Sequence, residues 1–187
     1  MRAVGLVLAL ACCAPARPTT PSAVVKADVD RAEKSELARQ HDAARAAYER
    51  AIADAHDPPS EHFARREYAD TLATWGEYAE MRRQLERVVA IDPDDAGAWH
   101  DLGMIFHHDG DDPRALAALE RAKQLAPRDF RARRELAKLR WALHDFAAAT
   151  AEFRAALDLP LTERERAAVQ WALDQLARPD HGLVPSS

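Results

Sequence analysis

Apolar and small residues recur along the chain at spacings of three and four, and the whole arrangement repeats every 34 residues. Spacings of three and four place side chains on one face of a helix, so the pattern predicts a series of amphipathic α-helices. A fixed period of this length indicates stacked structural repeats. Three slots of the period hold Tyr68, Leu102 and Leu136; Ala69, Gly103 and Ala137; and Leu85, Leu119 and Phe153.

Turn-forming residues divide each period into two helices. Gly76 and Gly110 occupy the same position in consecutive units, and Pro93 and Pro127 close those units. Glycine and proline interrupt helices, so each unit is expected to fold as helix, turn, helix. The units span residues 62–95, 96–129 and 130–161.

The most complete unit reads Trp99-x2-Leu102-Gly103-x2-Phe106, followed by Ala115-x3-Leu119-x2-Ala122 and Pro127. This motif resembles the tetratricopeptide repeat position for position. The resemblance implies an all-α fold, a right-handed superhelical array of about four helix-turn-helix repeats. A degenerate first repeat is expected at residues 23–61, where Tyr48 matches the second-helix pattern and Pro58 closes the unit.

The segment after the fourth repeat begins with a capping box. Thr162 and Glu165 stand three residues apart, the spacing at which two side chains cap a helix N-terminus reciprocally. Residues 162–178 are expected to form a helix that shields the last repeat from water, and residues 179–187 a loose tail. The apolar face of that helix is predicted to carry Ala168, Trp171, Ala172 and Leu176.

Short polar side chains mark the expected starts of other helices. Asp112 precedes Pro113, which is the order of an N-cap and a proline at the first helical position. Ser60, Asp129 and Asp145 are further predicted N-caps because their oxygens can accept hydrogen bonds from the first free backbone N–H groups.

Composition agrees with a folded array and narrows the range of partners. Hydrophobic residues make up 48% of the 187 residues, which is ordinary for a folded protein. The formal net charge is −5 and the pI is about 5.9, so the chain lacks the basic footprint of a nucleic-acid-binding protein. We therefore expect no nucleic-acid partner.

The first residues have the organisation of a bacterial lipoprotein signal peptide. Arg2 gives a positive start, and the apolar run that follows is shorter than the roughly 20 residues that a membrane-spanning helix needs. The run ends in Cys12 and Cys13, which resembles the lipobox, where small residues precede the lipidated cysteine. Residues 1–11 are expected to be removed, Cys12 (alternatively Cys13) to be lipidated, and the proline-rich residues 12–22 to form a flexible tether.

The same resemblance implies a location. Several acyl chains on one cysteine anchor a protein more firmly than a single chain does, so the protein is expected to be exported and held in the cell envelope by lipid. In enteric bacteria an aspartate after the lipidated cysteine retains a lipoprotein at the inner membrane. Cys13 is not aspartate, so the outer membrane is favoured. The alternative is a soluble periplasmic or secreted protein cleaved after Ala11.

In tetratricopeptide arrays the first helix of each unit lines a concave binding face, and the resemblance places four residues per unit there. These positions hold Phe63, Arg66, Asp70 and Ala73 in the second unit, Gly97, His100, Met104 and His107 in the third, and Arg131, Arg134, Lys138 and Trp141 in the fourth. All of them except Asp70, Ala73 and Gly97 are predicted to contact a partner.

The set in the fourth unit suggests the chemistry of that partner. Arg131, Arg134, Lys138 and Trp141 share one helical face, and three cations beside a tryptophan suit an acidic or C-terminal peptide with an apolar anchor. Exposed ion pairs contribute about 0.2–1 kcal/mol each, whereas a buried interface tryptophan contributes about 2 kcal/mol or more. We expect Trp141 to provide most of the binding affinity and the three cations to attract and orient the peptide electrostatically. The alternative is that Trp141 packs on a neighbouring helix and the cations form a solvated face.

The sequence gives little evidence for a metal site or for catalysis. His107 and His108 precede several aspartates, which are residue types that bind metal ions. However, His100 and His107 stand two turns apart, about 10 Å along a helix, which is too far for one ion without a further ligand between them, and Gly110 belongs to a turn. No cysteine follows Cys13, and neither a glycine-rich phosphate loop nor a nucleophile-elbow motif is present. The sequence therefore predicts no catalytic residue, no metal site and no cofactor.

These observations predict a non-enzymatic protein–protein interaction scaffold. It would help to assemble or position an envelope complex by binding a protein or peptide, acidic in character, in its concave groove. Two alternatives remain open from the sequence. One is a structural protein that associates with itself, and the other is an accessory or regulatory subunit of an envelope enzyme.

Overall fold

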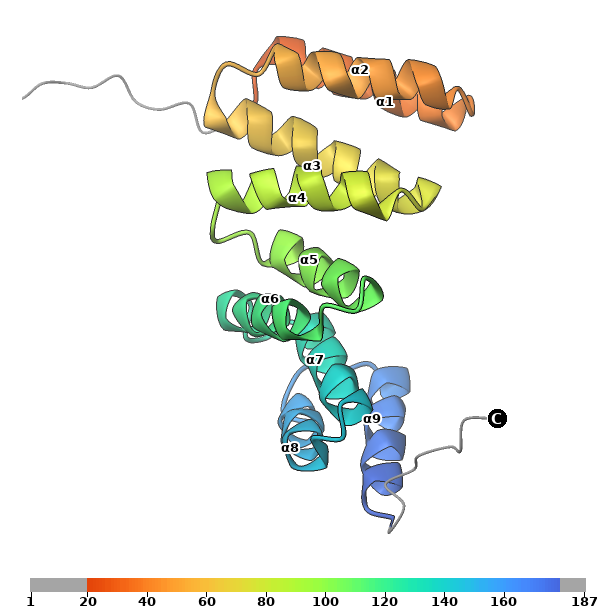
Figure 1. Ribbon diagram of the computed structural model, residues 1–187, viewed down its shortest axis with the longest axis vertical. Coiled ribbons are helices and arrows are strands. Elements are labelled where there is room, and N and C mark those ends of the chain that lie inside the picture. Colours follow the sequence, from red (N-terminus) through yellow and green to blue (C-terminus); the bar gives the residue numbers. More distant parts are fainter. Residues whose placement is uncertain (1–19, 179–187) are drawn as a thin grey trace, which may run out of the picture.

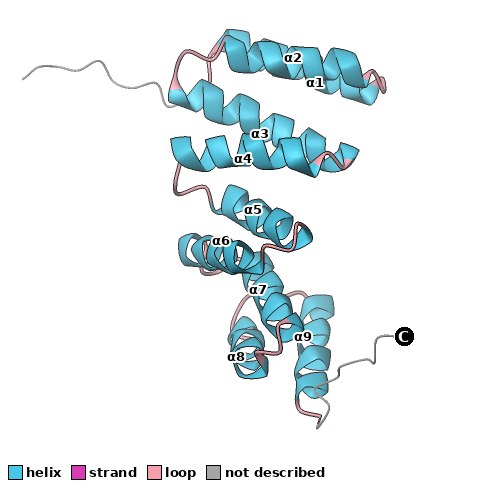
Figure 2. Cartoon of the chain, in the orientation of Figure 1, coloured by secondary structure: helices cyan, strands magenta, loops and turns pink. Residues whose placement is uncertain are grey.

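The structure, a computed structural model, describes residues 20–178. In this part of the chain every regular element is an α-helix, and short turns connect the helices (Figure 2). The helices are α1 Ala23–Leu37, α2 His41–Ala53, α3 Pro58–Trp75, α4 Tyr78–Ile91, α5 Ala96–His108, α6 Asp112–Leu125, α7 Phe130–Ala142, α8 Phe146–Ala156 and α9 Glu163–Leu176.

Consecutive helices pack as hairpins that stack along an elongated molecule. The pairs are α1 with α2, α3 with α4, α5 with α6, and α7 with α8, and α9 packs against α8 at the C-terminal end (Figure 1). The predicted fold class, an all-α superhelical array of repeats, is confirmed for the described residues. Among these residues no helix combines the length and hydropathy that a membrane span requires.

Each hairpin turns at a residue in the left-handed conformation. Gly76 and Gly110 have φ angles of 75° and 79°, which explains why the pattern places glycine in these turns. Arg39 and His144 occupy the corresponding turns of the first and last hairpins, with φ angles of 56° and 63°. The backbone geometry of the turn is therefore kept in hairpins that lack the glycine.

The repeating slots of the sequence form the core. The large slots are at most 3% exposed: Tyr68, Leu85, Leu102, Leu119, Leu136 and Phe153. The core has two parts that meet at α7. Leu136 and Leu139 pack with α1–α6, whereas Phe130 and Ala137 on the same helix pack with α8 and α9.

A cluster of charges joins the third hairpin to the fourth. Glu152 on α8 is 7% exposed and accepts hydrogen bonds from Lys123 Nζ at 2.7 Å and Arg133 Nη1 at 2.8 Å. Arg140 contacts both Glu152, at 3.4 Å, and Glu120 on α6. We call these five residues the Glu152 cluster. It links α6, α7 and α8 next to the point where the core divides.

The helix caps agree with the sequence at several positions. The Asp129 side chain accepts the Arg131 N–H of α7, and the Asp145 side chain accepts the Ala148 N–H of α8. The predicted capping box of α9 is present, because Thr162 and Glu165 each accept the other's backbone N–H.

Two predicted caps differ from the structure. The N-cap of α6 is Asp111, which accepts the Arg114 N–H at 3.2 Å, whereas Asp112 is the first helical residue. Ser60 is not an N-cap, because Asp57 caps α3 and accepts both the Ser60 N–H at 2.9 Å and the Ser60 hydroxyl at 2.8 Å.

The cap of α3 also moves a repeat boundary. The two prolines at 58 and 59 open α3 instead of closing the first unit, since proline is favoured in the first turn of a helix. Residues 58–61, assigned above to the first repeat, therefore belong to the second hairpin. The predicted signal peptide at 1–11, the predicted lipidation sites Cys12 and Cys13, most of the predicted tether and the predicted tail at 179–187 lie outside the described residues.

Candidate partner-binding site

A pocket of about 520 Å³ opens at the C-terminal end of the array, between α7 and α9. Its walls are mainly apolar side chains and aromatic rings. They come from α7 (Phe130, Arg134, Lys138, Trp141, Ala142), α8 (Phe153) and α9 (Ala168, Val169, Trp171, Ala172). Its size lies in the range of pockets that bind ligands or side chains of a partner.

Four aromatic rings line this α7–α9 pocket. The Trp141 ring meets Phe153 edge-on, with centroids 6.3 Å apart, and lies 6.3 Å from the Trp171 ring at an angle of 44°. Trp141 is half-buried, whereas Trp171 is 62% exposed. Trp141 therefore packs on a neighbouring helix, which was the alternative to partner binding, and it also lines the pocket.

Two cations stand at the pocket rim and share one carboxylate. Arg134 Nε and Lys138 Nζ each donate to Glu135, at 2.7 Å in both cases. Burial acts to raise the pKa of Glu135, but the hydrogen bonds from Lys138 and Arg134 outweigh it and hold that pKa below its usual value. Because one anion faces two cations, the three side chains carry one net positive charge.

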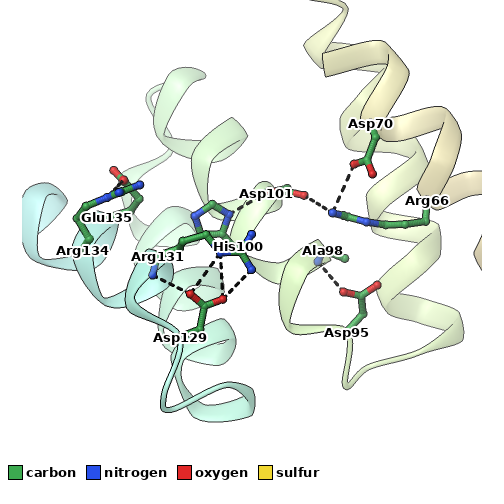
Figure 3. Close-up of polar contacts among 10 residues, drawn as sticks. All are labelled: Arg66, Asp70, Asp95, Ala98, His100, Asp101, Asp129, Arg131, Arg134 and Glu135. Carbon is green, nitrogen blue, oxygen red and sulfur yellow. Dashed lines mark hydrogen bonds and ion pairs between the residues drawn. The ribbon is translucent and has the colours of Figure 1, made fainter. Parts of the chain in front are cut away.

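Arg131, the fourth residue of the predicted set, is engaged elsewhere. It lies one turn before Arg134, but its guanidinium turns back to Asp129, with Nη2 2.7 Å and Nε 3.0 Å from Oδ2 (Figure 3). This hydrogen bonding lowers the pKa of Asp129. Arg131 does not line the α7–α9 pocket, so the structure brings together three of the four residues.

The predicted residues of α5 do not line the α7–α9 pocket. His100 Nδ1 lies 3.0 Å from Asp101 Oδ1, and its Nε2 is buried without a hydrogen-bond partner. Met104 is 38% exposed and lines a separate hollow of about 220 Å³ between α4 and α5. His107 is exposed near the end of α5, with Nδ1 2.7 Å from Asp112 Oδ1.

The predicted residues of α3 lie farther along the array. Arg66 Nη2 is 2.7 Å from Asp101 Oδ2 and 3.4 Å from Asp70 Oδ1, so it ties α3 to α5 (Figure 3). Phe63 lines a third hollow, of about 450 Å³, with His62 and residues from the end of α4. The predicted residues of the concave face therefore lie in separate surroundings on α3, α5 and α7 and do not form one common site.

The helix after the last repeat supplies site residues that the sequence analysis did not assign to binding. The prediction that Ala168 and Trp171 lie on the face that shields the last repeat is wrong, because both are exposed while Val169, Ala172 and Leu176 are buried. One sequence signal was available. Trp171 stands two residues after Val169 and so lies off the stripe defined by Val169, Ala172 and Leu176.

Potential metal ligands remain dispersed in the structure. Residues 20–178 contain no group of three or more His, Cys, Asp or Glu side chains that could hold one ion. The histidines of α5 instead pair individually with neighbouring aspartates, as described for His100 and His107.

Comparison with known proteins concerns the fold. No family model and no curated protein matches the sequence. Among solved structures, the crystal structure of MamA has a TM-score of 0.67 at 18% identity and covers 82% of this chain and 86% of MamA. The tetratricopeptide repeat (TPR) domain of P58(IPK) has a TM-score of 0.58 at 22% identity, covering 62% of this chain and 32% of that one.

A third similar structure is the first TPR of Spaghetti (RPAP3), which was solved bound to the HSP90 peptide SRMEEVD. Its TM-score is 0.55 at 16% identity, and the match covers 63% of this chain and 94% of that one. Identities between 16% and 22% establish similarity of fold alone. On that basis, and with the repeating slots in the core, the chain has the fold of tetratricopeptide-repeat proteins.

Proposed function

We propose that this protein is a non-enzymatic protein–protein interaction scaffold that holds a protein or peptide segment on its concave face. The observation that carries the proposal is the α7–α9 pocket, where Trp171 is 62% exposed beside Trp141 and the cations Arg134 and Lys138 line the same space. An exposed apolar patch rimmed by polar groups marks an interaction site. A protein of the same fold, the first TPR of Spaghetti (RPAP3), holds a peptide.

The other polar residues of the concave face support binding over catalysis. Arg66 ties α3 to Asp101 on α5, and Arg131 is held by Asp129 at the start of α7. The first contact joins the first helices of two neighbouring hairpins, and the second fixes the Arg131 side chain at the start of α7, so a partner meets an ordered surface. We assign no catalytic residue, metal or cofactor to this function.

Site-specific photo-crosslinking in living cells tests the scaffold. A photoreactive residue replaces Met104, which is exposed on α5, or Ala151, which is exposed on the second helix of the last hairpin as the matched control. We expect position 104 to give a discrete adduct with another protein and position 151 to give none. Identical adducts at both positions, or none at either, would contradict the proposal. An adduct of the chain with itself would favour self-association.

The place where the scaffold acts is part of the proposal. We infer that it is exported and anchored by lipid at Cys12, with the outer membrane favoured and a soluble periplasmic or secreted form as the alternative. Helix α1 begins at Ala23, so residues 13–22 would separate the lipid from the array. Ten extended residues reach about 35 Å, enough for the array to meet partners near the membrane surface.

Metabolic labelling with an alkyne fatty acid tests the anchor. We expect label on the wild-type chain and its loss in Cys12→Ser, with the protein shifting from the membrane to the soluble fraction. Cys13→Ser is the matched control and should keep the label. Loss of label only in Cys13→Ser would move the site to Cys13, and an unlabelled wild-type chain would leave secretion as the alternative.

A further inference from the structure

Helix α9 does more than shield the last hairpin. A helix that only caps a repeat array presents a polar outer face to water. Here Val169, Ala172 and Leu176 cover the hairpin, while Trp171 and Ala168 face the α7–α9 pocket. An indole that stays 62% exposed leaves apolar surface that a partner can bury.

The dimensions of the pocket suit bulky side chains. Its volume of about 520 Å³ accommodates one or two large apolar residues of an extended or helical segment. Tryptophan rings at 141 and 171 and phenylalanine rings at 130 and 153 surround this space from three helices. Buried aromatic anchors of this kind dominate binding at protein interfaces.

The positive charge of Arg134 and Lys138 determines which residues would flank such an anchor in the bound segment. The Lys138 side chain is 59% exposed and the Arg134 side chain 41% exposed, while Glu135 between them is 9% exposed. Both cations can therefore reach a ligand, whereas the carboxylate that they share is covered. A carboxylate on the ligand could pair with both cations, and Lys138 is the more exposed of the two, whereas Arg134 also interacts electrostatically with Glu165 at the start of α9.

We propose that the α7–α9 pocket is the docking site for an acidic segment of a partner protein that carries a bulky apolar anchor. The anchor enters between Trp141 and Trp171, and flanking carboxylates pair with Arg134 and Lys138. This inference rests on the proposed scaffold function and adds α9 to its binding surface. Charge complementarity at the rim favours such a segment over an uncharged apolar occupant.

Peptide selection tests the chemistry of the segment without knowledge of the partner. The probe is a display library of random 12-residue peptides, offered to the full chain with Cys12→Ser and Cys13→Ser so that no lipid is attached. We expect enriched sequences to combine Trp, Phe or Leu with neighbouring Asp or Glu. Enrichment of basic or uncharged sequences, or of none, would overturn the inference.

Two variants test the location. Trp171→Ala and Lys138→Glu should each weaken binding of an enriched peptide about tenfold or more, while Tyr78→Ala and Lys34→Glu, exposed residues outside the pocket, should leave it unchanged. Because Trp171 and Lys138 are exposed, their variants are expected to fold, and circular dichroism checks this. Equal binding by all four variants would overturn the inference.

The tryptophan indole N–H signals in a nuclear magnetic resonance spectrum provide an independent readout. The Trp75 and Trp99 N–H groups donate to Glu36 and to the Pro93 carbonyl, away from the pocket. Peptide binding should shift the signals of Trp141 and Trp171 and leave the other two in place. Shifts at Trp75 or Trp99 alone would overturn the inference.

The selection and the crosslinking experiment separate the two proposals. An adduct at position 104 together with peptide binding that ignores Trp171 would retain the scaffold and reject the α7–α9 pocket as its docking site. Concentration-dependent shifts of Trp141 and Trp171 without peptide would instead show a second copy of the chain in the pocket. Binding that persists in Lys138→Glu would indicate an uncharged apolar occupant.

Discussion

Gly103 shows how one residue sets the distance between two helices. Its position on α5 faces Leu119 on α6, and a Cβ atom built on it would lie 2.6 Å from Leu119 Cγ. The equivalent positions of neighbouring hairpins hold Ala69 and Ala137, which are fully buried. The third hairpin is therefore packed too closely for the methyl group that the other two accept.

Replacing Gly103 with alanine should lower the free energy of unfolding by about 1 kcal/mol, and by at most about 2 kcal/mol. Overpacking costs about 1–3 kcal/mol, and the higher helix propensity of alanine returns about 1 kcal/mol. Urea denaturation measures the change. Gly97→Ala on the same helix is the comparison, because the atoms nearest its Cβ would all be side-chain atoms, the closest being Asp95 Oδ1 at 3.3 Å, so it should destabilise the protein less than Gly103→Ala does. Equal stability of Gly103→Ala and wild type would contradict this account.

His62 is a second residue with a defined role, since it links α3 to the start of α5. Its Nε2 lies 3.0 Å from Oδ2 of Asp95, the N-cap of α5. The hydrogen bond to Asp95 raises the pKa of His62, and the same bond lowers the pKa of Asp95. Both shifts favour the ion pair of a protonated histidine with a carboxylate.

The contribution of His62 to stability should depend on pH. Its pKa in the folded chain exceeds the unfolded value of about 6.5, so the stabilisation is complete below about pH 6.5 and is lost as pH rises through the folded pKa. The difference in unfolding free energy between wild type and His62→Gln should therefore be larger near pH 6 than near pH 8.5. In an Asp95→Asn background this pH dependence should disappear, and its persistence would exclude the pair as the cause.

At the scale of elements, the hairpin turns show a common geometry built from different residues. Gly76 and Gly110 adopt positive φ without steric cost, whereas the left-handed conformation costs other residues about 1–2 kcal/mol. Arg39 and His144 bear this cost in the first and last hairpins. The His144 ring also contacts Phe146, with centroids 5.6 Å apart, which offsets part of it.

Arg39→Gly should stabilise the protein by about 0.5–1 kcal/mol, because relief of the left-handed strain exceeds the entropy that glycine adds to the unfolded chain. Thermal unfolding followed by circular dichroism measures the gain. His144→Gly should gain less, since it loses the contact with Phe146. Gly110→Ala is the reverse control and should destabilise the protein, because alanine is strained at the positive φ of this turn. A destabilised Arg39→Gly would show that the arginine side chain has a role beyond the turn.

At the scale of the whole molecule, the Glu152 cluster connects the two parts of the core. Glu152 pairs with Lys123, Arg133 and Arg140 where α6, α7 and α8 meet, and Glu120 pairs with Lys123 and Arg140 as well. A carboxylate that is 7% exposed and contacts three cations is costly to remove, because two carboxylates balance three cations and Arg133 loses its counter-charge. The Glu152 cluster lies between the hairpins of α1–α6 and the helices that form the α7–α9 pocket.

Glu152→Gln should lower the free energy of unfolding by about 2–3 kcal/mol and loosen α7–α9 before α1–α6. Hydrogen exchange followed by mass spectrometry measures both effects, with faster exchange expected in α7–α9. Glu49→Gln, an exposed residue of α2, is the matched control and should change neither. Uniform loss of protection along the chain would show that the Glu152 cluster stabilises the array without dividing it.

The fold could be predicted from the sequence because its determinants are local and repeated. The 34-residue slots alternate small and large residues, and burial of Leu102, Leu119 and Leu136 follows directly from that pattern. The start of α3 was harder to predict, since two adjacent prolines can end one helix or begin the next. Hydrogen bonds from Ser60 to Asp57 decide in favour of a beginning.

The sequence by itself determined the repeat period, the all-α class and the face on which Arg134, Lys138 and Trp141 lie together, because helical spacing fixes which side chains share a face. Only the tertiary structure decided that Trp171 of α9 completes a pocket with residues of α7 and α8. The physical reason is that this outcome depends on distances between elements, whereas the pairing of Arg131 with Asp129 is a local contact at the start of α7. The stripe of Val169, Ala172 and Leu176 indicates which side of α9 packs on α8, but no local pattern shows that Trp171 on the other side lies beside Trp141 of α7.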